Sequence, residues 1–117
     1  MDNRSKKLLF DVLSAARSIA VWCHGRSYGE YEDDRQLRRA VEREFEVIGE
    51  ALSRLEKGDP ATAAGIEDLR RIVGFRNRII HGYDTIDDAT VWGVIEVRLP
   101  RLIEQVSDLL EQAGERV

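Results

Sequence analysis

Apolar side chains recur at every third or fourth position through most of this 117-residue chain. Within residues 5–23, for example, Leu9, Val12, Leu13 and Ala16 share one face of a helical projection. This is the period of an amphipathic helix, and nowhere does the alternation of a half-buried strand replace it. The periodicity predicts an all-α fold: an antiparallel bundle of four to five helices.

Glycine and proline mark where the expected helices end. The first helix spans about residues 5–23 and stops at Gly25, and a polar connection over residues 26–30 follows. The second begins near Glu32 or Asp33 and ends at residues 58–60, where Gly, Asp and Pro follow one another. Gly49, with Ala40 and Ala51, keeps part of this helix narrow enough for another helix to approach closely.

After a weakly patterned segment at 61–65, which favours a short helical turn, a third helix spans about 66–81. Gly82 lies where a glycine commonly terminates a helix. The fourth helix spans about 87–112 and contains Pro100, which removes a backbone donor and should kink the helix without ending it.

Composition fits one helical domain over residues 1–117, with its core at about 5–112. Hydrophobic residues make up 43% of the chain and charged residues 34%. Neither a membrane-spanning stretch nor a signal-peptide pattern is visible, so the expected location is the cytoplasm. The net charge of -4 argues against a protein that coats nucleic acid generally. Cys23 is the single cysteine, and it and His24 are interpreted as structural rather than metal-binding.

The segment 76–83 contains the residues best suited to chemistry. Arg76 supplies a permanent cation with fixed donors, and His81 is the side chain best suited to moving protons near neutral pH. Arg76 could stabilise the charge on a phosphate while His81 transfers protons, with Asn77 orienting either group. These groups suffice to cut RNA without a metal or another cofactor. Arg70, Arg71 and Arg78 add a local basic strip, which suits a focused phosphate site.

Helix geometry complicates this hypothesis. Five residues separate Arg76 from His81, which places them roughly 140° apart around a helix axis. Three solutions stay open: the long arginine reaches around, the helix loosens at His81, or a second copy of the chain completes the site. A histidine in the last turn also lies near the negative end of the helix dipole, which favours its protonated form.

Structural interpretations of the same residues are also available. Arg76 could form a surface salt bridge and His81 a structural hydrogen bond, with Tyr83 an ordinary amphipathic tyrosine. Glu46 and Glu50 are interpreted as structural, or as partners of the motif arginines, rather than as catalytic. For Asp33 and Asp34 we favour helix initiation over metal binding.

The segment 76–83, with its Arg-x4-His-x-Tyr pattern, resembles the HEPN superfamily and specifically the HepT-like toxins. The resemblance extends over about residues 5–110. Residues 7–13 look like the opening helix of the family, residues 46–51 are similar to its central-helix signature, and Val91-Trp92 with Leu99-Pro100 resembles its final helix.

This resemblance implies a HEPN-like homodimer in which two Arg-x4-His motifs meet in a cleft and cut RNA without metal. It implies a toxin of a type VII-like toxin–antitoxin pair, with Arg76 and His81 catalytic and Asn77 supporting. The expected antitoxin is a minimal nucleotidyltransferase (MNT) that transfers AMP from ATP to Tyr83, and toxin and antitoxin could assemble into a larger hetero-oligomer.

Two other functions stay open. The chain could be a non-catalytic subunit that binds a nucleotide or docks a nucleotidyltransferase; RNA would then stay intact, and partner binding would survive Arg76→Ala and His81→Ala. A plain helical dimerisation domain is disfavoured, because it gives no reason for the grouping of Arg76, Asn77, His81 and Tyr83.

Overall fold

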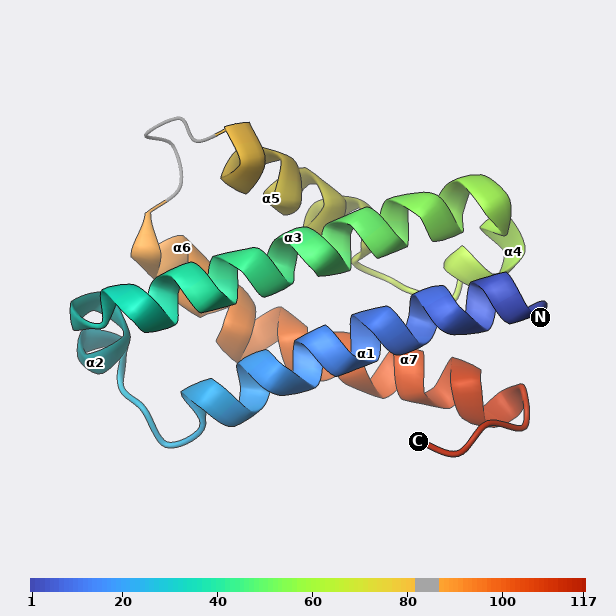
Figure 1. The fold of residues 1–117 in the computed structure, drawn as a ribbon, viewed down its shortest axis with the longest axis horizontal. Coiled ribbons are helices and arrows are strands. Elements are labelled where there is room, and N and C mark those ends of the chain that lie inside the picture. Colours follow the sequence, from blue (N-terminus) through green and yellow to red (C-terminus); the bar gives the residue numbers. More distant parts are fainter. Residues whose placement is uncertain (82–86) are drawn as a thin grey trace.

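Long helical segments lie side by side and reverse direction from one to the next in the computed structural model (Figure 1). The structure describes residues 1–81 and 87–117, without the side chains of residues 80 and 81. The all-α prediction is confirmed, and short helices supplement the long ones. The helices are α1 (Asn3–Cys23), α2 (Tyr28–Asp33), α3 (Arg35–Gly58), α4 (Pro60–Ala63), α5 (Leu69–His81), α6 (Asp88–Gly93), the π-helical turn η1 (Val94–Arg98) and α7 (Leu99–Gln112).

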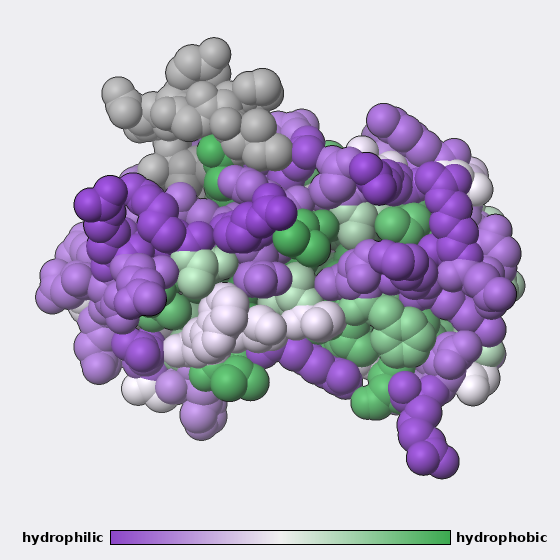
Figure 2. All heavy atoms as spheres, viewed as in Figure 1, coloured by the Kyte–Doolittle hydropathy of each residue, from purple (hydrophilic) through white to green (hydrophobic). Residues whose placement is uncertain are grey.

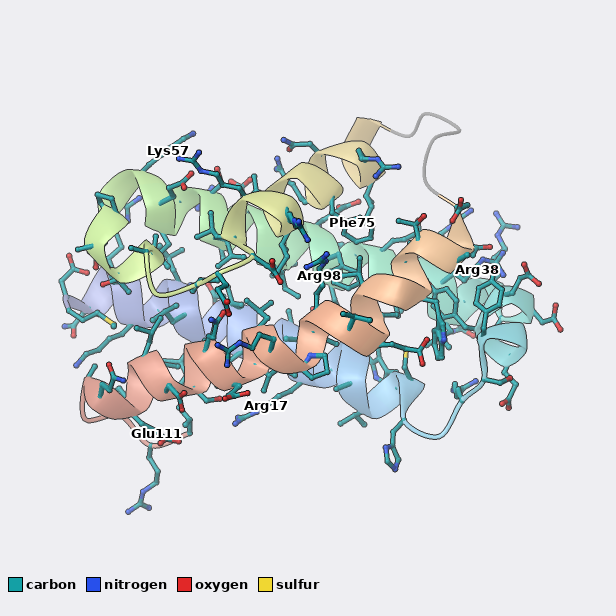
Figure 3. All side chains as sticks on the ribbon, turned by 180° about the vertical axis from the view of Figure 1, so that it is seen from behind. Arg17, Arg38, Lys57, Phe75, Arg98 and Glu111 are labelled. Atoms are coloured by element: carbon teal, nitrogen blue, oxygen red, sulfur yellow. The ribbon has the colours of Figure 1, made fainter. Side chains whose placement is uncertain are left out.

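The core lies where the apolar stripes of these helices meet, as the periodicity predicts. Between α3 and α5, Phe45 and Phe75 meet edge to face, with ring centroids 5.0 Å apart and ring planes at 88°; Phe75 is labelled in Figure 3. This aromatic pair packs α5, the helix of the motif, against the bundle. The most deeply buried residues include Leu9, Val12, Leu13, Ala16 and Ile19 of α1, Val41, Phe45, Ile48, Leu52 and Leu55 of α3, and Leu102, Val106 and Leu110 of α7.

The region between α1 and α3 differs from the prediction of a simple connection. Ser27 and Glu30 form a reciprocal capping box, in which the Ser27 hydroxyl accepts from the Glu30 amide and the Glu30 carboxylate accepts from the Ser27 amide. The cap starts α2 within the segment expected to be irregular. The following helix therefore begins later than expected, at Arg35, after Asp34 caps it by accepting from the Leu37 amide at 3.0 Å.

Pro100 produces a local change of helix type. The turn η1 closes with the Leu99 amide donating to the Val94 carbonyl, five residues back, and α7 starts with Pro100 in its first turn. A proline cannot donate to the carbonyl four residues before it, so the preceding turn widens. The expected disturbance at Pro100 is thus a π-helical turn, and the helical path continues to Gln112. In the described residues, no helix combines the length and apolar character required to span a membrane.

Asp59 joins α1 to the turn between α3 and α4. One carboxylate oxygen accepts from the Thr62 amide at 3.2 Å, and the other accepts from the Thr62 and Ser5 hydroxyls at 2.6 and 2.8 Å. Hydrogen bonds from Thr62, and then from Ser5, lower the pKa of Asp59 from its ordinary value. The ionised carboxylate is therefore the form that the folded protein stabilises.

We expect this carboxylate to contribute to acid sensitivity. Because the pKa of Asp59 is lower in the folded chain than in the unfolded chain, its contribution is present above about pH 4 and is lost as pH falls through the folded-state pKa. Urea unfolding of wild type and Asp59→Asn at several pH values measures this. The stabilities of the two proteins should converge in acid. A gap that stays constant down to the acid limit would contradict the assignment.

Candidate functional site

Helix α5 carries the first part of the predicted motif and places it against α3. Arg76 is partly buried at the contact between the two helices, whereas Asn77 is exposed. Helix α5 extends to His81, so the backbone stays helical up to the motif histidine. The His81 side chain and the whole of Tyr83, the predicted modification site, lie outside the described residues.

Helices α3 and α5 approach each other closely at Gly49, near the motif. A Cβ atom built on Gly49 would lie 2.2 Å from Cβ and 2.4 Å from Cγ of Arg76. Only a residue without a side chain permits this approach. The expectation that Gly49 allows another helix to come close is confirmed, and the group that occupies the space is the stem of Arg76.

The guanidinium of Arg76 is held from two sides. Its Nη2 donates to Oε2 of Glu50 at 2.6 Å, and its Nη1 donates to Oδ1 of Asn77 at 2.9 Å. The other oxygen of Glu50, Oε1, accepts from Nε of Arg54 at 2.9 Å. Glu50 is therefore a partner of a motif arginine, one of the roles considered from the sequence. Arg54 was not singled out, although its spacing of four residues from Glu50 is a signal for a helical ion pair.

Arg76, Glu50 and Arg54 line a pocket of about 240 Å³ on the face formed by α1, α3 and α5. Leu8, Val47 and Ala51 supply its apolar lining. Figure 2 shows this side of the molecule, where hydrophobic surface over α1 is bordered by hydrophilic side chains. The charged lining residues are Asp11, Arg43, Glu46, Glu50, Arg54 and Arg76.

The predicted basic strip does not converge on this pocket. Arg70 and Arg71 line a separate cavity of about 590 Å³ beside α4. Arg70 lies 3.6 Å from Glu56, with a side chain that is 91% exposed. Among the described residues that line the 240 Å³ pocket, Arg76 is the member of this strip of four arginines. The fold therefore places Arg70 and Arg71 at one pocket and Arg76 at another, and does not gather the strip in one site.

The other residues that the sequence suggested as candidates have mainly structural roles. Glu46 lines the pocket but pairs with Arg43 at 3.2 Å. Asp34 caps α3, as expected for helix initiation. Cys23 is buried, and burial raises the pKa of its thiol. His24 is exposed at the end of α1. The part of the chain that the structure describes contains no group of three His, Cys, Asp or Glu side chains placed to hold a metal ion.

The fold and this site define a class: an all-α bundle whose candidate site is a positioned arginine at a helix contact, five residues before a histidine. Comparison with known proteins identifies the family. The model described as "Ribonuclease HepT-like" matches residues 12–109. The chain belongs to this HepT-like ribonuclease family, which confirms the resemblance seen in its motifs.

Similar proteins carry names consistent with the family. Two are from Methanocaldococcus jannaschii: "Putative RNase MJ1380" is 31% identical over 101 residues, covering 86% of this chain and 92% of the relative. "Putative RNase MJ0125" is 27% identical over 111 residues, covering 95% of each. "Putative RNase TTE0752" of Caldanaerobacter subterraneus subsp. tengcongensis is 31% identical over 88 residues, covering 75% of this chain and 78% of the relative. No solved structure matches the chain.

Proposed function

We propose that this chain is an endoribonuclease toxin that cuts RNA without a metal ion and acts as a homodimer. The observation that carries the proposal is the Arg76 guanidinium, held by Glu50 and Asn77 at the edge of a pocket in a member of a ribonuclease family. A held guanidinium is suited to bind a phosphate oxygen in a defined orientation.

The proposed reaction uses the 2′-hydroxyl of RNA as the nucleophile. A base, the neutral imidazole of one His81, takes the 2′-hydroxyl proton while the 2′-oxygen forms a bond to phosphorus. Arg76 stabilises the negative charge that builds on the phosphorane oxygens. The bond from phosphorus to the 5′-oxygen then breaks, and an acid, the imidazolium of a second His81, protonates the leaving oxygen. The products are a 2′,3′-cyclic phosphate and a free 5′-hydroxyl.

A second copy of the chain supplies the second histidine in this proposal. Because α5 is helical through His81, the roughly 140° between Arg76 and His81 persists within one chain. Two copies related by a two-fold axis could bring an arginine from one chain near a histidine from the other. This arrangement gives dimerisation a direct role in catalysis.

The proposed regulation acts on Tyr83, two residues after His81. A nucleotidyltransferase antitoxin would transfer AMP from ATP to the Tyr83 hydroxyl, releasing pyrophosphate. The added group carries bulk and a negative phosphate, which would compete with RNA for Arg76. Mass spectrometry of the chain after incubation with ATP and the antitoxin should show one added AMP on the peptide containing Tyr83, and none in Tyr83→Phe.

The direct test of the nuclease is purified wild-type protein with RNA and excess chelator. We expect cleavage to continue, with 2′,3′-cyclic phosphate ends detected by chemical or enzymatic end-group analysis. Loss of cutting on chelation, with recovery when a divalent metal is returned, would contradict the metal-free mechanism. Intact RNA under all conditions would instead favour a non-catalytic docking subunit.

A further inference from the structure

The carboxylate that holds Arg76 comes from another helix, 26 residues earlier in the chain. We propose that Glu50 is a positioning residue, which fixes the Arg76 guanidinium in the orientation that RNA cleavage needs. The inference rests on the proposed function and adds to it a residue outside the Arg-x4-His-x-Tyr motif. Three features of the contact between α3 and α5 support it.

The first feature is how the donors of Arg76 are used. A guanidinium has five N–H groups, and each terminal nitrogen carries two of them. One hydrogen of Nη2 is directed to Glu50 and one of Nη1 to Asn77. A second hydrogen therefore remains on each terminal nitrogen. Because the Arg76 side chain is 24% exposed, it can still meet a ligand while its two hydrogen bonds hold the plane of the group.

The second feature is the restricted stem of Arg76. Gly49 precedes Glu50 in α3, and its missing side chain leaves the space that Cβ and Cγ of Arg76 occupy. The Nε atom is buried, with no hydrogen-bond partner among the described residues. Leaving a buried donor unpaired costs free energy, so packing and the bond to Glu50 must together compensate for this position. Gly49 and Glu50 thus act on the same side chain, one on its stem and one on its charged end.

The third feature is the balance of charge around Glu50. Arg54 donates to one oxygen of this carboxylate and Arg76 to the other, so two cations share one anion. This trio has a net charge of +1, and the carboxylate does not cancel the attraction of the group for a phosphate. The neighbouring acidic side chains have other partners: Asp11 pairs with Lys7, and Glu46 pairs with Arg43. Glu50 is the carboxylate of the pocket that the structure connects to Arg76.

Glu50→Gln is the informative variant, with Glu42→Gln in the same helix as its matched control. Glutamine keeps the size of the side chain but replaces the ion-paired hydrogen bond with a weaker one, in which the guanidinium donates to an uncharged amide oxygen. We expect kcat for a short RNA to fall about 10- to 100-fold in Glu50→Gln, the scale of a misplaced catalytic group, with KM changed far less. Glu42→Gln removes a carboxylate that pairs with Arg39 on the same helix, outside the described lining of the pocket, and its kcat should match that of wild type.

Nitrogen NMR of the Arg76 side chain tests the same inference without requiring RNA cleavage. Rotation about the bond between Nε and Cζ should be slow in wild type and Glu42→Gln and measurably faster in Glu50→Gln. Identical Arg76 signals in all three proteins would overturn the inference. Equal or higher kcat in Glu50→Gln would also overturn it, because Glu50 would then be neutral or would compete with phosphate. If wild type cuts no RNA, the proposed function fails, and the NMR comparison alone still decides whether Glu50 orders Arg76.

Discussion

The His81→Ala protein is expected to cut RNA about 10²- to 10⁴-fold more slowly than wild type, the usual contribution of a positioned acid or base. His81 is the last residue of α5, and the proposed mechanism gives its imidazole both proton transfers. In the proposed dimer the substitution removes both His81 side chains. The reaction then lacks both the base that accepts the 2′-hydroxyl proton and the acid that protonates the leaving oxygen. Single-turnover cleavage of a defined RNA, with wild type and variant at equal concentration, measures the loss.

His24→Ala is the matched control for this prediction, because the chain has two histidines and His24 is the other. It lies exposed at the end of α1, and the pocket near Arg76 does not include it. Its substitution should leave the cleavage rate and its pH dependence unchanged. Wild type should show a bell-shaped dependence on pH, which reports one base and one acid, and His81→Ala should not. A His81→Ala protein that retains the full rate would exclude the proposed chemistry.

Helical periodicity was sufficient to predict most of this fold, because long amphipathic stripes are the strongest local signal in a sequence. The stripe of α3, with Phe45, Ile48 and Leu52, is buried as its spacing requires. The errors occurred where hydrogen-bonding side chains, rather than apolar ones, decide the local structure. The short helix α2 depends on the reciprocal bonds of Ser27 and Glu30 in a segment that is mostly polar.

The candidate site could be predicted only in part, for a related reason. Arg76, Asn77 and His81 are close in the chain, so a local motif brings them to notice. The bond between Arg76 and Glu50 instead depends on how α3 and α5 pack, and one sequence does not state which of several glutamates faces a given arginine. Gly49 did indicate that another helix could approach closely. The structure was needed to identify that helix as α5 and the contacting residue as Arg76.

Gly49→Ala is expected to destabilise the protein by about 1–3 kcal/mol, the typical cost of forcing an extra carbon into a packed contact. The added Cβ would lie 2.2 Å from Cβ of Arg76, an atom fixed to the backbone of α5, so side-chain rotation cannot relieve the clash. The two helices must separate locally. Urea unfolding measures the stability, and cleavage should fall as well because the stem of Arg76 moves with α5.

Gly74→Ala provides the control, since it makes the same substitution within α5 at a position where, apart from the adjacent backbone of its own helix, nothing described lies within 4 Å of the new carbon. In an open helical position, alanine is favoured over glycine by roughly 0.5–1 kcal/mol, so this variant should equal or exceed wild type in stability. The opposite signs of the two effects separate packing from helix propensity. If both variants were stabilised, the contact between Gly49 and Arg76 would not be tight in solution, and the structural basis for positioning Arg76 would be lost.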